Sequence, residues 1–186
     1  MNLYDRFQAG LPVAEFIAKY GTPPQASRWK QTFDAIALTD AQKTLLKSFR
    51  REMNVLVLAG VWCGDCSGQC PIYDRFAEVA PSIHVRYIDR DEHADVQREL
   101  QINGGNRVPV VVFFSEDGHE VGRYGERTLS KYRAMMEQHA GASCPTGLVQ
   151  HDIPLLAQVS QDWLNEFERV EWVLRLSSRL RSKHGD

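Results

Sequence analysis

The sequence predicts an α/β fold in which helices pack on a β-sheet, with helical segments before and after the sheet-forming region. Three observations carry this prediction. Residues 1–52 and 142–186 repeat apolar residues at helical spacing, whereas residues 53–141 alternate short apolar runs with helical patterns. Elements in that middle region follow the order β-α-β-α-β-β-α, which is typical of a sheet covered by helices.

Residues 1–52 form a helical N-terminal extension. Apolar residues recur every three or four positions over residues 3–17, which predicts one helix that ends at the Gly-Thr-Pro-Pro stretch of residues 21–24. A further helix has two candidate N-cap residues, Thr39 and Asp40, because short polar side chains accept hydrogen bonds from the first N–H groups of a helix.

Residues 53–141 contain the predicted sheet. The first strand, residues 54–59, is apolar throughout after Asn54, as expected for a strand buried on both faces. Asp117-Gly118 signals a hairpin between the last two strands. The later predicted strands span residues 83–88, 108–114 and 120–124, and the predicted helices follow the first strand to residue 80 and then span residues 94–101 and 129–139.

Residues 142–186 are expected to form a turn, which contains Cys144, and one long helix from about Pro154 to Leu180. The helix carries an apolar stripe at three- and four-residue steps, formed by Leu156, Val159, Trp163, Phe167, Val170 and Leu174. Most such stripes pack on their own domain. Self-association of two chains through the C-terminal helix is the alternative interpretation.

Composition and charge exclude several functional classes. Of the 186 residues, 43% are hydrophobic and 25% charged, which is ordinary for a chain that buries a core. A net charge of −2 argues against nucleic acid and anionic membranes as partners. The N-terminus lacks the basic start and apolar run of an export signal. We therefore expect a cytoplasmic protein, in a reducing compartment where clustered cysteines are more often catalytic or metal-binding than structural.

Three cysteines, Cys63, Cys66 and Cys70, follow the first predicted strand directly. A disulfide staple is the weakest interpretation, because so small a loop contributes only about 2 kcal/mol. A metal site is more attractive, since the spacing overlaps the end of an iron–sulfur C-x2-C-x2-C-x3-C-P run. Gly60 stands where that run needs its first cysteine, however, and only Cys144 is left as a fourth thiolate. We therefore expect no metal.

Redox chemistry fits the cluster best. A C-x-x-C between a buried strand and a helix lies at the helix N-terminus, where unpaired N–H groups and the helix dipole stabilise a thiolate. Cys63 is the outer thiol, so we expect it to have a lowered pKa and to act as the nucleophile. Cys66 lies one turn further in and is placed to resolve the mixed disulfide.

The residues around this motif resemble the thioredoxin superfamily over residues 54–141. Residues 62–66, Trp-Cys-Gly-Asp-Cys, are similar to the family's W-C-x-x-C active site, and Pro71 matches the proline that bends its active-site helix. Val108-Pro109 stands where the family has a cis-proline facing the disulfide. The resemblance implies a thioredoxin fold, a central mixed β-sheet flanked by helices, here with helical N- and C-terminal extensions.

The resemblance also implies a function: a thiol–disulfide oxidoreductase that reduces protein or small-molecule disulfides through Cys63 and Cys66. Trp62, Val108 and Pro109 would frame the substrate. No cofactor is implied, and an upstream electron donor, thioredoxin reductase or another thiol system, would restore the dithiol. The competing interpretation is a binding module of the same fold with little turnover.

Two departures from the family pattern affect the expected chemistry. Val57 occupies the position, six residues before Cys63, where the best-known thioredoxins have a buried aspartate that assists proton transfer. Gly64 and Asp65 form the dipeptide between the cysteines and are expected to modulate the site. A carboxylate at about 6 Å would raise the pKa of Cys63 by about half a unit to two units. A purely structural role for Asp65 in the first helical turn is the alternative.

The other two cysteines have simpler interpretations. Cys70 continues a helical stripe that starts at Cys66 and runs on through Tyr73, so a buried packing thiol is favoured over a third redox centre. Cys144 is interpreted as a bystander thiol in a turn.

Overall fold

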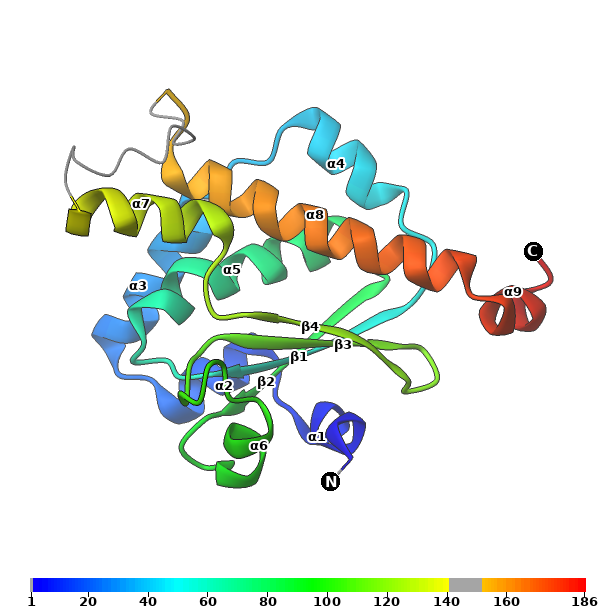
Figure 1. Ribbon diagram of the computed structural model, residues 1–186, viewed down its shortest axis with the longest axis horizontal. Helices are drawn as coiled ribbons and strands as arrows, with labels where there is room; N and C mark the ends of the chain where they lie inside the picture. The colour runs from blue at the N-terminus through cyan, green and yellow to red at the C-terminus, as the bar shows by residue number, and fades with distance from the viewer. Residues whose placement is uncertain (1, 141–151) are drawn as a thin grey trace.

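The computed structural model describes residues 2–140 and 152–186, and Figure 1 shows their arrangement around one four-stranded sheet. The helices before the sheet are α1 (Leu3–Ala9), α2 (Val13–Tyr20), α3 (Pro23–Ala35) and α4 (Asp40–Lys47). The central region contains β1 (Met53–Ala59), α5 (Gly64–Val79), β2 (Ile83–Asp89), α6 (Ala94–Glu99), β3 (Val110–Ser115), β4 (Glu120–Gly125) and α7 (Leu129–Ala140). After it come α8 (Leu155–Leu176) and α9 (Ser178–His184).

The sheet is mixed, with the strand order β2-β1-β3-β4. β1 pairs in parallel with β2 and antiparallel with β3, and β3 pairs antiparallel with β4. All residues of β1 and β3 are buried, the polar Asn54 and Ser115 included, as the apolar runs predict. The element order β-α-β-α-β-β-α is confirmed. Because β1 is a central strand, α5 begins at the middle of one sheet edge.

Helices cover both faces of the sheet (Figure 1). α5 and α8 lie on one side, whereas α1 and α6 lie on the other. One continuous group of buried side chains includes residues from the helices on both sides. The helical extensions therefore share the core of the central region.

The predicted first helix is in fact two helices. Between α1 and α2, Leu11 leaves the helical path and pairs with Tyr87 of β2, through N–H···O bonds of 2.9 and 2.8 Å. The prolines expected to end a helix instead begin one. Thr22 and Gln25 form a capping box at the start of α3, and Pro23 is its first residue, where proline's missing N–H costs nothing.

One of the two candidate N-cap residues of the next helix is confirmed. Thr39 is the N-cap of α4, and its side chain accepts a hydrogen bond from the N–H of Gln42. Asp40, the other candidate, is the first residue inside the helix.

The predicted C-terminal helix is also two helices. α8 ends before Ser177, whose backbone is extended and whose side chain caps α9 by accepting a hydrogen bond from Leu180. A residue that offers its hydroxyl to the next helix favours such a break over continuation.

The apolar stripe of α8 packs on the chain's own core. Trp163 and Phe167 are fully buried, and both rings contact the ring of Tyr73 in α5. Self-association through the C-terminal helix stays a proposal, and it would need the outer face, where Trp172, Val173 and Leu176 are exposed. Among the described residues, no helix is long and apolar enough to cross a bilayer. Cys144 lies outside the described residues.

Candidate active site

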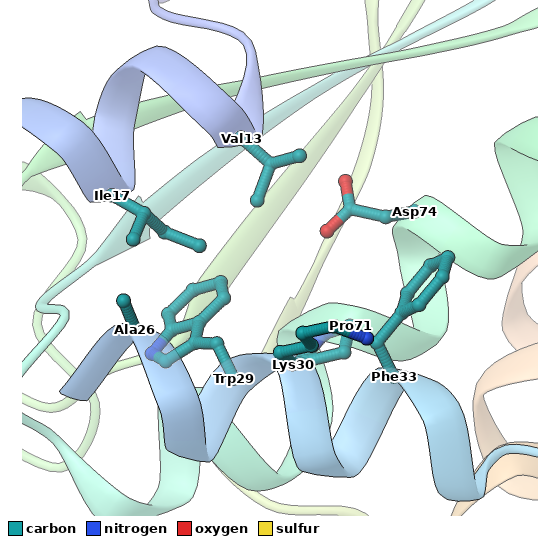
Figure 2. Close-up of a pocket in the computed structure, with 8 residues that line it drawn as sticks. All are labelled: Val13, Ile17, Ala26, Trp29, Lys30, Phe33, Pro71 and Asp74. Carbon is teal, nitrogen blue, oxygen red and sulfur yellow. The ribbon is translucent and has the colours of Figure 1, made fainter. Parts of the chain in front are cut away.

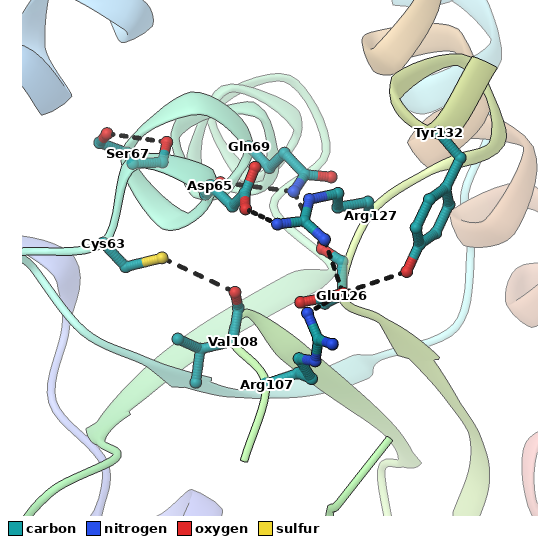
Figure 3. A network of polar contacts seen from close by, with 10 residues as sticks. Cys63, Asp65, Ser67, Gln69, Arg107, Val108, Glu126, Arg127 and Tyr132 are labelled. Carbon is teal, nitrogen blue, oxygen red and sulfur yellow. Dashed lines mark hydrogen bonds and ion pairs between the residues drawn. The ribbon is translucent and has the colours of Figure 1, made fainter. Parts of the chain in front are cut away.

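The candidate site is built at the start of α5, where Cys63 is the N-cap residue. Its side chain is partly buried, and its thiol is directed at the carbonyl oxygen of Val108, 3.8 Å from Sγ (Figure 3). The backbone N–H groups of Asp65 and Cys66 also face the sulfur. These are N–H groups that have no partner inside the helix, so they favour a thiolate. The motif thus places one accessible thiol at a helix N-terminus.

Cys66 and Cys70 lie deeper on α5, and both side chains are fully buried. The Cys66 thiol is hydrogen-bonded to Cys63 on one side and to Cys70 on the other. All three thiols are free, so the structure shows the reduced dithiol. The predicted burial of Cys70 is confirmed.

The expected lowering of the Cys63 pKa is wrong for this reduced state. The hydrogen bond to Cys66 raises the pKa of Cys63 above that of a free thiol, and partial burial raises it further. Burial likewise raises the pKa of Cys66. The helix N–H groups act in the opposite direction but do not outweigh these causes. Because the Cys63 and Cys66 thiols interact, a negative charge on one thiol opposes loss of the proton from the other.

The three residues proposed to frame a substrate lie around Cys63. Val108 is buried, the Val108–Pro109 peptide bond is cis, and the Val108 carbonyl faces the thiol. Trp62 precedes Cys63 and is 42% exposed, a large fraction for a tryptophan. Gly60 makes room for this indole, since a Cβ there would lie 2.7 Å from the ring.

Arg90 fixes one side of this surface. Its guanidinium carbon lies 4.4 Å from the centre of the Trp62 ring, within the range of a cation–π contact. The same side chain donates a hydrogen bond of 3.3 Å to the carbonyl oxygen of Asn106. Arg90 thus joins the segment before Cys63 to the loop that leads to Val108.

The dipeptide between the cysteines has two different environments. Gly64 is exposed, and a Cβ added there would meet no atom within 4 Å. Asp65, by contrast, accepts a hydrogen bond of 2.6 Å from Arg127, as Figure 3 shows. Asp65 therefore lies in the first turn of α5 as half of an ion pair, so its charge is not free to act on the thiol alone.

Arg127 belongs to a larger polar network behind the dipeptide (Figure 3). It also binds Glu126 at 2.7 Å, and Glu126 receives further hydrogen bonds from Arg107 at 3.2 Å and Tyr132 at 3.1 Å. Burial lowers the pKa of Arg127, but its ion pair with Asp65 outweighs this and holds that pKa above its ordinary value. The segment between β4 and α7 is thereby tied to the first turn of α5.

Both extensions contact the segments that carry the cysteines. Trp29 of α3 donates a hydrogen bond of 3.2 Å to the carbonyl oxygen of Val61, two residues before Cys63. Trp163 of α8 donates one of 3.1 Å to the amide oxygen of Gln69, and the Gln69 amide nitrogen donates to the Glu126 carbonyl at 2.9 Å. The extensions thus support the candidate site from two sides.

A partly buried carboxyl group lies further along α5. Asp74 lines a pocket of about 220 Å³ between α2, α3 and α5, shown in Figure 2. It accepts a hydrogen bond of 2.9 Å from the hydroxyl of Tyr87. Burial raises the pKa of Asp74 to about 7, even though the Tyr87 hydrogen bond acts to lower it. At the position of the family's usual aspartate, Val57 is completely buried among apolar side chains.

Sequence reasoning missed the residues that surround the motif. Arg127 lies 62 positions from Asp65, and no local pattern pairs the two. Gln69 lies within a predicted helix, and neither Gln69 nor Arg90 was singled out from the sequence. The charged Glu126-Arg127 pair after Gly125 was the one available signal. Within the residues that the structure describes, histidine, cysteine and acidic side chains form no cluster of three or more suited to a metal ion.

Comparison with known proteins places the chain in a family. A family model described as Thioredoxin matches residues 10–140. The chain is 25% identical over 116 residues to protein disulfide-isomerase tigA of Aspergillus niger, and 27% identical over 119 residues to the probable protein disulfide-isomerase A6 of Medicago sativa. These matches cover 60% and 61% of this chain, but only 29% of either relative.

A solved structure shares the fold over most of the chain. It is the crystal structure of a protein of unknown function from Pseudomonas aeruginosa, which is 18% identical, with a TM-score of 0.66, and the match covers 88% of this chain and 93% of the other. At that identity the likeness shows the fold alone. The family match takes in all four strands and the cysteine motif, and the fold is the thioredoxin fold with helical extensions at both ends. The chain belongs to the thioredoxin family.

Proposed function

We propose that the chain is a thiol–disulfide oxidoreductase that reduces protein or small-molecule disulfides with Cys63 and Cys66. One observation carries the proposal. The partly exposed thiol of Cys63 belongs to the N-cap residue of α5, and the buried thiol of Cys66 is hydrogen-bonded to it from the first turn of the same helix. Relatives named as protein disulfide-isomerases support the same class of chemistry.

The reaction follows from this geometry. The Cys63 thiolate attacks one sulfur of the substrate disulfide, a mixed disulfide forms, and the other substrate sulfur leaves as a thiolate that takes up a proton. Cys66 then loses its proton and attacks Cys63, which releases the second substrate thiol and leaves a Cys63–Cys66 disulfide. The substrate gains two electrons, and the dithiol loses them.

The neighbouring residues have roles in this scheme. Val108 and Pro109 border Cys63, so an extended substrate segment would lie along them, and the exposed Trp62 would contact its other side. Gly64 leaves the approach to the thiol open. No bound cofactor takes part. An external donor, thioredoxin reductase or another thiol system, would reduce the disulfide again, in keeping with a cytoplasmic setting.

A direct test is insulin reduction with dithiothreitol as the donor, followed by the precipitation of the free B chain. We expect the wild-type chain to accelerate precipitation and Cys63→Ser to abolish the acceleration. Cys66→Ser should instead accumulate a mixed disulfide between Cys63 and the substrate, visible by mass spectrometry under non-reducing conditions. The proposal fails if the wild-type chain and Cys63→Ser reduce insulin at the same rate.

A binding module with little turnover is the second candidate, and the raised pKa of Cys63 favours it. Since only the thiolate attacks, a raised pKa leaves few reactive chains at neutral pH. For an oxidoreductase with this thiol, the rate should climb about tenfold per pH unit below the pKa of Cys63. A binding module would instead hold its partner equally well after Cys63→Ser.

A further inference from the structure

The ion pair between Asp65 and Arg127 joins two segments that the sequence keeps far apart. Asp65 is in the first turn of α5, between the two cysteines, and Arg127 follows β4. An Arg127 nitrogen lies 2.6 Å from an Asp65 oxygen, and the two side chains are only 16% and 19% exposed. Such a pair is partly shielded from solvent, so screening by water and salt is weaker than at the surface.

The charges of the network balance only when Arg127 is present. Two carboxylates, Asp65 and Glu126, face two guanidinium groups, Arg107 and Arg127. Arg107 contacts Glu126, whereas Arg127 contacts both carboxylates. Loss of Arg127 would leave Asp65 without this cation, two residues from Cys63.

A thiolate on Cys63 is sensitive to that charge. The N–H groups of Asp65 and Cys66 already face the sulfur, so the thiolate forms at the same helix turn that carries the Asp65 carboxylate. An unbalanced carboxylate there would oppose it. For a charge about 6–8 Å away, between surface-like and water-like screening, Coulomb's law gives a pKa shift of about half a unit to two units.

We propose that Arg127 is a positioning residue that sets the reactivity of the Cys63 thiol by neutralising Asp65. The inference rests on the proposed function, in which Cys63 is the nucleophile. The ion pair with a distant arginine thus allows the Gly-Asp dipeptide to lie beside a reactive thiolate.

The test removes each charge of the Asp65–Arg127 pair separately and then both together. In a Cys66→Ala background, the pKa of Cys63 is read from the pH dependence of iodoacetamide alkylation, with the Cys63 peptide quantified by mass spectrometry. Arg127→Gln should raise that pKa by about half a unit to two units. Asp65→Asn should lower it, because Arg127 then lacks one carboxylate. The double variant should return to within about 0.3 unit of the parent.

Two further variants serve as controls. Arg181→Gln removes one positive charge from α9, at the opposite end of α8 from the network, and should leave the pKa of Cys63 unchanged. Arg127→Lys keeps the charge and should stay close to the parent. If Arg127→Gln does not fold, as judged by far-UV circular dichroism, Asp65→Asn and Arg127→Lys still decide the question.

The outcomes separate the two proposals. A shift below about 0.3 unit in both Arg127→Gln and Asp65→Asn overturns the inference. So does a double variant shifted as far as Arg127→Gln alone, since that marks a merely structural loss. Alkylation needs no substrate disulfide, so a chain that shows the shifts and their reversal but reduces no insulin refutes the proposed function and leaves the role of Arg127 standing.

Discussion

At the scale of single residues, the chain's chemistry depends on how deeply each polar group is buried. Cys63 remains partly exposed, Cys66 and Cys70 are fully buried, and Asp74 is partly buried. Burial raises the pKa of Cys66, Cys70 and Asp74. The Asp74 carboxyl group stays protonated up to about pH 7 in the folded chain, whereas the unfolded chain ionises it at a much lower pH. Its ionisation therefore affects the stability of the fold.

Asp74 is therefore expected to make stability pH-dependent. Its pKa is raised from 3.8 to about 7, so the folded state holds a proton that the unfolded state has lost. The contribution of Asp74 to the free energy of unfolding should fall as the pH rises from about 4 to 7, by up to about 4 kcal/mol, and should be lost above that range. Asp74→Asn removes the ionisation. Urea denaturation at pH 4.5 and pH 8 should show that the free energy of unfolding of the variant rises relative to that of the wild type only at pH 8. A constant difference between the two proteins would contradict this.

The pairing of the cysteines is a second prediction for single residues. Mild oxidation should join Cys63 to Cys66, which are hydrogen-bonded in the reduced state. Cys70 is fully buried and should be slow to alkylate in the native protein. Peptide mapping of the oxidised chain measures both. A dominant Cys66–Cys70 bridge would overturn the assigned roles, and Cys70→Ala should leave the predicted bridge intact.

At the scale of elements, α8 contacts α5, the helix that carries the cysteines, through one buried hydrogen bond. Trp163 donates to Gln69, and Gln69 donates in turn to the Glu126 carbonyl, so three segments are joined at one amide. Trp163→Phe keeps an aromatic ring in the core but removes the donor. The Gln69 oxygen is then left buried without this partner, which costs about 1–3 kcal/mol.

A matched control lies on the same helix. Trp172 is 46% exposed and donates to Glu168, so Trp172→Phe should change stability by no more than about 0.5 kcal/mol. Chemical denaturation of both variants checks the comparison. Equal losses would mean that the Gln69 hydrogen bond contributes no more than a surface contact does.

The elements also show where sequence reasoning succeeded. The segments around Val57 and Val111 are apolar on both faces, so they are predicted to form central strands, which are covered on both sides. Helix breaks were missed, because Leu11 and Ser177 leave their helices for backbone and capping partners that periodicity does not reveal. The cysteine motif was found from local spacing, but the Asp65–Arg127 pair depends on the tertiary fold.

At the scale of the whole molecule, the absence of a metal is a testable expectation. Gly60, which stands where an iron–sulfur motif would need a cysteine, lies against the Trp62 indole. Protein purified without added metal should carry no stoichiometric zinc or iron, and a chelator should leave its Tm unchanged. One metal ion per chain by elemental analysis, lost together with the fold, would decide for the metal interpretation.

The shared core predicts that the extensions and the central region unfold together. Trp29 of α3 contacts Phe16 and Tyr87, and Trp163 of α8 contacts Tyr73, so each extension shares an aromatic cluster with the central region. Loss of either extension would expose part of that cluster, which ties their stabilities together. Urea unfolding followed by tryptophan fluorescence and by far-UV circular dichroism should therefore give coincident curves with one midpoint. A fluorescence change that precedes the loss of helical signal would show that an extension separates first, and Trp29→Phe would then identify which one.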